Sequence, residues 1–122
     1  MAQITLRLSD DKLLQLQQRS SELNLTVTDY LLSKAIPGYI DEILTVDKIL
    51  DKLDSIQKDE KFTLKSLYPK EIWESFTTGS RISTGRLFYQ SYEKNLYNLK
   101  NRIEFLGKNS ANLAIYKKLT DN

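Results

Sequence analysis

The chain opens with a strict alternation of polar and apolar residues, and two amphipathic helical patterns follow it. Residues 3–8 have the two-residue period of a strand with one buried face. Ser9 is placed to cap a first helix, and Thr26 is placed to cap a second one. Asn24 suits the turn between them because asparagine tolerates the left-handed conformation. The pattern predicts a strand and two helices within residues 1–38.

Residues 39–60 carry a different pattern, in which apolar residues alternate spacings of four and three. The residues in this short heptad seam are Tyr39, Ile43, Val46, Leu50 and Leu53. A short isolated helix is marginal in water, so we expect this one to pack against another helix. The sequence therefore predicts an amphipathic helix over 39–58 that links two domains, with a linker ending near residue 60.

Residues 61–122 alternate short helical and strand patterns and predict a small α+β domain. Pro69 suits the start of one helix, and a turn at 78–80 leads to a second helix that Ser83 is placed to cap. Two strand patterns then flank residues 107–110 as a hairpin. The order helix, turn, helix, hairpin is that of a winged helix. The fold class predicted for the whole chain is mainly α with short β.

The N-terminal strand is expected to need a second copy of the chain. A lone strand leaves backbone groups unpaired on both edges and forms no stable sheet. Two copies that pair antiparallel would satisfy those groups and bury the apolar faces of four helices together. Folding of residues 1–38 should then be coupled to dimerisation. A strand whose polar side simply faces water is the alternative interpretation.

Pairing would turn the polar side of each strand outward. The outward residues are Gln3, Thr5 and Arg7. A two-stranded ribbon fits the major groove of DNA, where arginine bonds guanine and glutamine pairs with adenine. Threonine can offer a hydroxyl group or touch a thymine methyl group. These three residues are therefore the candidate base contacts.

Residues 2–36 resemble the ribbon-helix-helix family of Arc, MetJ and CopG-type repressors. The resemblance is carried by residues 3–8 and by the stretch 24–26. It implies that the outward strand residues read bases and that the second helix holds a phosphate with its N-terminus. The phosphate contacts implied in this way are Thr26, Val27 and Thr28. Asn24 stands where the family often has glycine.

Residues 62–119 resemble a small family of uncharacterised domains in Gram-positive bacteria, their plasmids and their phages. The similar stretches are 62–65, 72–73, 79–83, 85–88 and 104–108. The resemblance implies a bacterial origin, from a mobile element in one interpretation, and brings no known activity.

Charge adds a candidate second DNA-binding surface. Residues 61–122 contain eleven basic and five acidic side chains, a difference of +6, whereas residues 41–60 contain three and seven. The candidate contacts are Arg81, Ser83, Thr84, Arg86, Gln90 and Lys108. The alternative is an assembly module whose aromatic residues form a core or an interface. These aromatic residues are Trp73, Phe76, Phe88, Tyr89, Tyr92 and Tyr97.

Composition argues against an enzyme, a metal and a cofactor. The chain has no cysteine and no histidine, so the commonest zinc ligands and general base are missing. Asp47, Asp51 and Asp54 alternate with Lys48 and Lys52, which is typical of a solvated helix face. No run of about 18 apolar residues predicts a membrane span. A bacterial cytoplasm, with association to the nucleoid or a plasmid, is the expected location.

These patterns predict a sequence-specific double-stranded DNA-binding protein, a dimeric transcriptional regulator or repressor. A tetramer through 39–58 or through the C-terminal domain is an alternative assembly. One alternative function is a relaxosome accessory protein, which binds a plasmid transfer origin and contacts a relaxase or another plasmid-encoded protein. Another is an antitoxin or assembly protein that acts mainly through protein partners. The symmetry of a dimer predicts repeated or inverted half-sites in its DNA.

Overall fold

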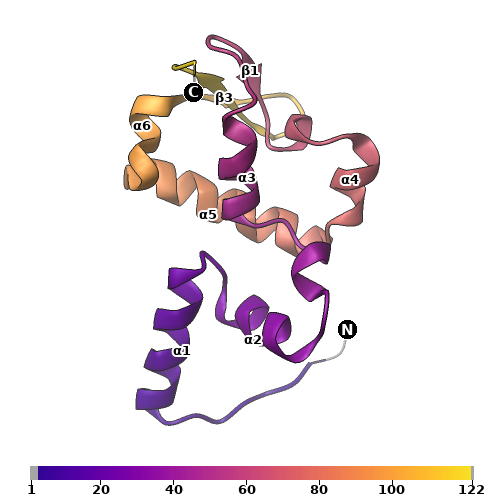
Figure 1. The fold of residues 1–122 in the computed structure, drawn as a ribbon, viewed down its shortest axis with the longest axis vertical. Helices are drawn as coiled ribbons and strands as arrows, with labels where there is room; N and C mark the ends of the chain where they lie inside the picture. Colours follow the sequence, from indigo (N-terminus) through magenta and orange to yellow (C-terminus); the bar gives the residue numbers. More distant parts are fainter. Residues whose placement is uncertain (1–2, 122) are drawn as a thin grey trace. The chain divides into compact units, whose positions relative to one another are not determined.

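The computed structural model describes residues 3–121 and divides the chain into two units (Figure 1). Unit 1 comprises residues 1–40 and unit 2 comprises residues 41–122. The structure is mainly helical, with one small antiparallel sheet of three strands in unit 2. The predicted class, mainly α with short β, is confirmed.

Two capped helices make up unit 1. Helix α1 (Asp10–Glu22) begins after Ser9, whose hydroxyl accepts a hydrogen bond of 3.3 Å from a backbone N–H of the first turn. Helix α2 (Val27–Ala35) begins in the same way after Thr26, with a bond of 3.1 Å. Asn24 lies between them at φ 56°, in the left-handed region. Both predicted helices, their caps and the turn are confirmed.

Unit 1 has almost no interior of its own. Ser20 is its only buried residue within the described range 3–40. Its exposed large apolar side chains are Ile4, Leu6, Leu8, Leu13, Leu14, Leu23, Ile36 and Ile40. Residues 3–9 form neither helix nor strand in the single chain. The expected strand at 3–8 is therefore not formed within one chain, and its pairing with a second copy stays a prediction.

The prediction of one continuous helix over 39–58 is wrong. A short 3-10 helix, η1 (Tyr39–Glu42), is followed by helix α3 (Val46–Leu53), and a bend separates the two. Thr45 is extended there, and its side chain accepts a backbone hydrogen bond of 3.2 Å that starts α3. From residue 41 onward the segment belongs to unit 2, so α3 is a core helix and not a linker.

The three strands of unit 2 form an antiparallel sheet in the order β1–β3–β2, and the helices of this unit that follow β1 all lie between β1 and β2 in the chain. The elements after α3 are β1 (Lys61–Phe62), η2 (Lys65–Leu67), α4 (Lys70–Ser75), α5 (Thr78–Glu93), η3 (Leu96–Asn98), α6 (Leu99–Arg102), β2 (Ile103–Lys108) and β3 (Ala114–Lys118). The predicted hairpin is confirmed as β2 and β3.

Two boundaries of the C-terminal region differ from the prediction. The loop of the hairpin comprises residues 109–113 and not 107–110, because β2 extends to Lys108. Helix α5 begins at Thr78 because the Thr77 side chain accepts a hydrogen bond from the Ser80 N–H at 3.3 Å. The turn expected at 78–80 thus lies inside α5, and Ser83 is a helix-interior residue and not a cap.

An aromatic core joins the sheet of unit 2 to α5. Tyr116 of β3 packs against Phe88 of α5 edge to face at 5.3 Å and stacks on Phe62 at 5.8 Å. The core residues are Leu44, Val46, Ile49, Leu53, Ile56, Phe62, Trp73, Phe76, Phe88, Leu99, Ile103 and Tyr116. Three of the six aromatic residues expected in a core or an interface are therefore core residues. Tyr89 and Tyr92 are half-buried, and Tyr97 is exposed.

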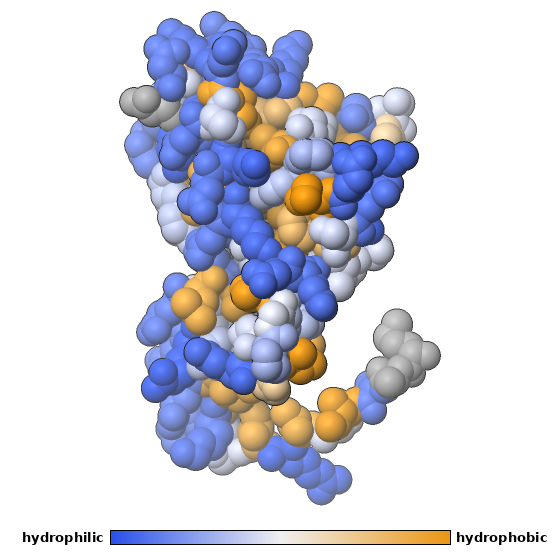
Figure 2. Space-filling view, turned by 45° about the vertical axis from the view of Figure 1, so that its right-hand side comes forward, coloured by the Kyte–Doolittle hydropathy of each residue, from blue (hydrophilic) through white to orange (hydrophobic). Residues whose placement is uncertain are grey.

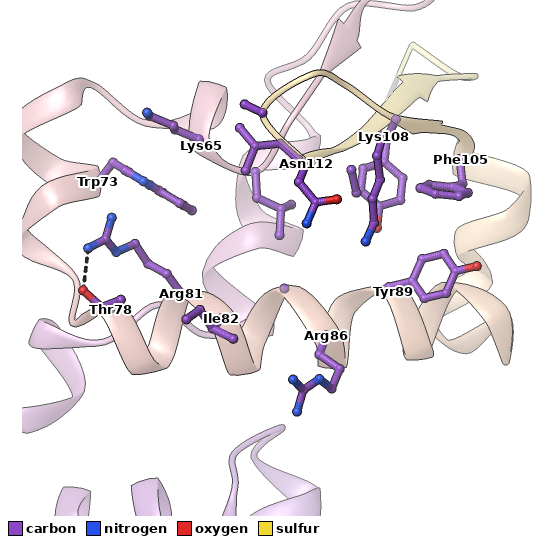
Figure 3. Close-up of a pocket in the computed structure, with 16 residues that line it drawn as sticks. Lys65, Trp73, Thr78, Arg81, Ile82, Arg86, Tyr89, Phe105, Lys108 and Asn112 are labelled. Carbon is purple, nitrogen blue, oxygen red and sulfur yellow. Dashed lines mark hydrogen bonds between the residues drawn. The ribbon is translucent and has the colours of Figure 1, made fainter.

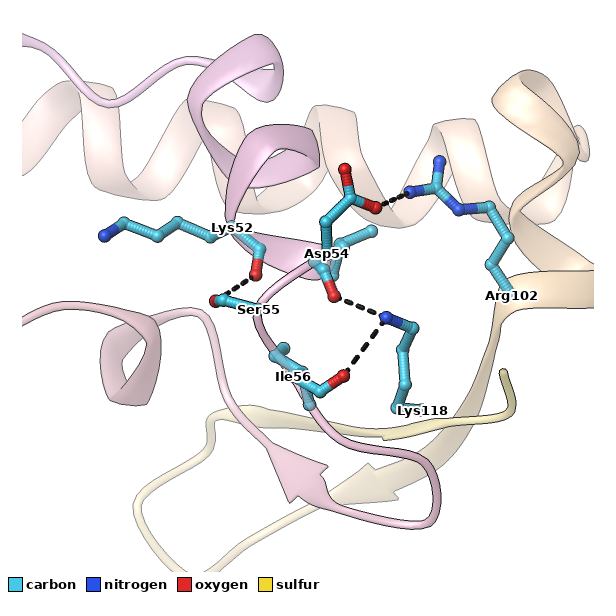
Figure 4. A network of polar contacts seen from close by, with 7 residues as sticks. Lys52, Asp54, Ser55, Ile56, Arg102 and Lys118 are labelled. Carbon is cyan, nitrogen blue, oxygen red and sulfur yellow. Dashed lines mark hydrogen bonds and ion pairs between the residues drawn. The ribbon is translucent and has the colours of Figure 1, made fainter. Parts of the chain in front are cut away.

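A fully buried lysine closes the end of α3. The Lys118 ammonium group donates hydrogen bonds to the carbonyl oxygens of Leu53 and Ile56 (Figure 4). Leu53 is the last residue of α3, and its carbonyl also accepts from the Ile56 N–H at 3.2 Å; Ile56 lies just beyond the helix. Burial lowers the pKa of Lys118, and the Asp54 carboxylate acts against this shift. Nearby, Arg102 reaches Asp54 at 3.4 Å.

Two hydroxyl groups of α5 form hydrogen bonds with the backbone of Leu44. The Ser80 hydroxyl accepts from the Leu44 N–H at 3.0 Å, and the Thr84 hydroxyl donates to the Leu44 carbonyl at 2.7 Å. Both hydroxyl-bearing residues are buried. The polar backbone of Leu44 is thus satisfied inside the core, where an unpaired group would be costly.

Thr84→Val keeps the shape of the side chain and removes this donor. We expect it to lower the free energy of unfolding by about 1–3 kcal/mol, because the buried Leu44 carbonyl loses its partner. Urea denaturation of the full chain measures the change. Ser83→Ala is the matched control, since the Ser83 hydroxyl bonds only within α5, to the Gly79 and Ser80 carbonyls. Equal stability of the two variants would contradict the role assigned to Thr84.

Tyr68 lies against two core rings and has a buried hydroxyl group. Its ring stacks on Trp73 at 6.4 Å and meets Phe76 edge to face at 5.3 Å. Among the described residues, its phenol oxygen has no hydrogen-bond partner. Burial raises the pKa of Tyr68 to about 12, and the Asp51 carboxylate adds to the effect.

Because the Tyr68 pKa is raised by folding, this group contributes stability below about pH 10, and the contribution is lost as the pH rises towards about 12. We expect Tyr68→Phe to lose less stability than the parent between about pH 9 and about pH 11. Urea midpoints at the two pH values measure the difference. The same fall in midpoint for both proteins would show that Tyr68 ionises as freely in the folded state as in the unfolded one.

Candidate nucleic-acid interface

The three candidate base contacts lie on an open N-terminal arm. Gln3, Thr5 and Arg7 are exposed, and so are the apolar residues that alternate with them. Ile4 is 85% exposed, the highest value among the large apolar residues. Both sides of the arm are therefore accessible in a single chain, and Figure 2 shows hydrophilic and hydrophobic residues side by side along it.

The candidate phosphate contacts lie at the first turn of α2. Thr26 uses its side chain to cap the helix, and Thr28 is exposed while Val27 is half-buried. The first backbone N–H groups of a helix have no partner within it and attract anions. Asp29 puts a negative charge in this turn, and the Tyr39 hydroxyl donates to that carboxylate at 2.8 Å. The turn thus offers amide donors together with one acidic side chain.

A groove of about 970 Å³ opens on unit 2 between α5 and the β2–β3 loop (Figure 3). Its other walls come from α4 and from the η2 segment. Its lining includes the polar and aromatic residues Lys65, Trp73, Arg81, Arg86, Lys108 and Asn112.

The groove is lined by four cations and by no carboxylate. Lys65, Arg86 and Lys108 are exposed, and Arg81 is half-buried. The Arg81 guanidinium lies over the Trp73 ring at 5.6 Å, and it donates a hydrogen bond of 3.0 Å to the Thr78 hydroxyl. In Figure 3, Lys108 extends from the hairpin towards α5, whereas Arg86 projects from the opposite side of the helix. The groove therefore has the electrostatics of an anion site.

A carboxylate lies just beyond the groove. The Tyr89 hydroxyl donates to the Glu93 side chain one turn further along α5, and this hydrogen bond raises the pKa of Tyr89. The ring of Tyr89 meets Phe105 of β2 edge to face at 5.0 Å. The aromatic residues at this end of the groove are thus engaged with each other and with Glu93.

The structure brings together half of the predicted second surface. Arg81, Arg86 and Lys108 line one groove, and Gln90 is exposed one turn beyond Arg86 on α5. The prediction that Thr84 contacts DNA is wrong, because Thr84 is 4% exposed and its hydroxyl donates to the Leu44 carbonyl. The Ser83 hydroxyl is occupied within α5.

Sequence reasoning missed Lys65 and Asn112 as groove residues. They lie far apart in the chain and far from α5 in sequence, and only the packing of η2 and the hairpin against the helix brings them to one place. The positive charge of residues 61–122 was the one available signal, and it gives no positions.

Residues 3–121 show neither a metal cluster nor a membrane-spanning helix. They contain no cluster of three or more acidic side chains placed to hold a metal ion. Their helices are all too short or too polar to cross a bilayer.

Comparison with known proteins gives one family match. Residues 47–118, more than half of the chain, match the family described as a domain of unknown function (DUF1413). Searches of curated proteins and of solved structures gave no match. The matched segment runs from α3 to β3 and contains the groove, whereas the N-terminal arm lies outside it.

Proposed function

The chain belongs to the DUF1413 family through residues 47–118, and we propose that it is a homodimeric regulator of transcription that reads the DNA major groove with residues 1–38. Two N-terminal arms pair antiparallel in this proposal and form a ribbon above the four helices of two copies. We further propose that unit 2 is a winged-helix-like module. The strand order β1–β3–β2 supports that assignment, as does the order α3, β1, α4, α5, β2, β3, into which unit 2 inserts the short helix α6 before β2.

The observation that carries the proposal is the missing interior of unit 1. No apolar side chain between residues 3 and 40 is buried, and eight large ones are exposed. Two short helices and an arm bury too little apolar surface to stay folded alone, and exposed apolar patches mark interaction surfaces. A second copy supplies a matching apolar face and, in its own arm, the strand partner that residues 3–8 lack.

Pairing decides which side chains remain available for DNA. With Ile4, Leu6 and Leu8 turned towards the helices, the alternating residues face outward from both copies. They are Gln3, Thr5 and Arg7. Their functional groups match the hydrogen-bonding edges of adenine, thymine and guanine in the major groove. A two-fold symmetric ribbon reads two related half-sites.

The start of α2 supplies a backbone contact in this proposal. The amides of Val27 and Thr28 lie in the first turn of the helix, where the helix dipole favours an anion. The negative charge of Asp29 weakens anion binding at this site. The Tyr39 hydroxyl donates a hydrogen bond to that carboxylate. We therefore assign the turn a positioning role and leave sequence recognition to the ribbon.

Leu6→Glu places a charge on the apolar side of the arm. We expect the variant to sediment as a monomer at concentrations where the parent is a dimer, because burying an unpaired carboxylate costs several kcal/mol (roughly 3 or more). Thr5→Glu is the matched control, one position away on the opposite side, and it should remain dimeric. A dimer for Leu6→Glu, or a monomer for the parent, would contradict the proposed pairing.

Arg7→Ala removes the candidate guanine contact. On a duplex that the parent protein selects from random sequence, we expect the binding free energy to weaken by roughly 1–3 kcal/mol. Binding to unrelated duplexes should change little. Lys12→Ala, which removes an exposed cation from α1, is the control for loss of charge alone. Footprinting on the promoter of the gene itself then distinguishes regulation of transcription from binding at a transfer origin. Unchanged selectivity in Arg7→Ala would refute the ribbon assignment.

A further inference from the structure

We propose that unit 2 carries a second surface for duplex DNA, in which the groove beside α5 holds a phosphate backbone and the outer stripe of α5 enters the neighbouring major groove. This inference rests on the proposed function only in taking duplex DNA as the ligand. It uses none of the residues of the N-terminal arm.

The first support is uncompensated positive charge. The ion pairs of Arg102 with Asp54 and of Lys117 with Asp59 lie outside the groove. The groove cations Lys65, Arg81 and Lys108 are not neutralised by a carboxylate among its walls, and Arg86 projects from the opposite side of α5. A cleft lined by one sign of charge concentrates ligands of the opposite sign, and phosphates release counterions when such cations bind them.

The second support is that Arg81 is held in place before any ligand arrives. Its guanidinium is fixed between the Thr78 hydroxyl and the face of the Trp73 ring. Its Nε atom is buried and has no hydrogen-bond partner within residues 3–121. A guanidinium oriented in this way loses little side-chain entropy when it binds a phosphate oxygen.

The third support is a rigid hairpin that aims Lys108. The register of β2 against β3 shifts between Phe105 and Gly107, and Gly107 has φ 107°, so the strand carries a bulge just before Lys108. Bulges re-aim the side chains that follow them. The loop after Lys108 is closed by the Asn109 side chain, which accepts from the Ala111 and Leu113 amides at 2.9 and 3.0 Å. The hairpin therefore presents Lys108 to the groove from an ordered loop.

The fourth support is the outer stripe of α5. Ile82, Arg86 and Gln90 follow one another at intervals of four residues and are all exposed, Ile82 by 60%. Residues spaced in this way share one face of a helix. Arginine and glutamine can pair with guanine and adenine, and an apolar side chain can contact the thymine methyl group. A helix of the length of α5 fits the major groove.

The packing of the aromatic residues favours a duplex over a single strand. Single-stranded ligands are held by bases stacked on free aromatic faces. Trp73 is 8% exposed and is covered by Arg81, and Tyr89 and Phe105 pack on each other. The groove therefore offers cations to a backbone and little open ring surface to a base.

The test uses the full chain and fluorescent duplexes over a series of salt concentrations. For the double variant Lys65→Ala/Lys108→Ala we expect a loss of affinity of roughly tenfold on every duplex, with the slope of log K against log salt reduced by about 2. Lys58→Ala, an exposed cation of unit 2 outside the groove, should leave both quantities unchanged. Arg86→Ala should change base preference at positions other than those that Arg7→Ala changes.

The outcomes separate this inference from the proposed function. If the parent binds duplex DNA and the double variant binds it equally well, the groove assignment is overturned and the ribbon stands. A loss in the double variant, with none in Arg7→Ala, supports the groove and overturns the ribbon. Tighter binding to a single strand than to the duplex, or displacement of the duplex by an acidic peptide at equal charge concentration, overturns duplex recognition by unit 2. Failure of the parent to bind any duplex overturns both.

Discussion

Apolar surface that a single chain cannot bury is the constraint on which the N-terminal half of this protein depends. Helices α1 and α2 are well capped, so they are locally determined, yet no apolar side chain among residues 3–40 is buried and eight leucines and isoleucines there are exposed. Capping stabilises a helix by about 1 kcal/mol, whereas most of the stability of a short helix comes from packing. In the proposed dimer, a second copy supplies the missing packing. The alternation of residues 3–8 then separates apolar side chains, which face the helices, from polar side chains, which face outward.

Unit 2 buries its apolar side chains in a core of its own. The way α5 packs on this core also determines which of its residues form the candidate second surface. Ser80, Thr84 and Phe88 lie on the inner stripe of α5, where they bind the Leu44 backbone and pack against Tyr116. Two positions after each of them the helix has turned by roughly 200°, so Ile82, Arg86 and Gln90 point away from the core. The contacts that fix the inner stripe therefore also fix the outer one. Any DNA contact made by α5 is held on a rigid element.

The sequence predicted most reliably the features that depend on neighbouring residues. Ser9 and Thr26 cap helices because the capping bond spans only three residues, and the hairpin follows from an asparagine that closes its loop and a glycine that forms the bulge just before it. The continuous helix over 39–58 failed because Thr45 could either continue the apolar stripe or cap a new helix, and burial of its neighbours favoured the cap. The start of α5 failed for a similar reason, since residues 77–84 contain several hydroxyl side chains that could cap a helix.

The groove could not be predicted from the sequence because it forms only when distant segments pack together. Its assembly from scattered lysines also limits the affinity for DNA that it can have alone. Lys65 and Lys108 lie more than 40 positions apart, and each is an ordinary exposed lysine in its local sequence. A surface built from a few such cations binds DNA weakly by itself. In the proposed dimer it need not bind strongly, because a ribbon already on DNA raises the local concentration of DNA near unit 2, and linked sites of this kind gain about 10²–10⁴ in avidity. The ribbon would then select the sequence, while two copies of unit 2 hold the flanking duplex in a way that salt weakens steeply.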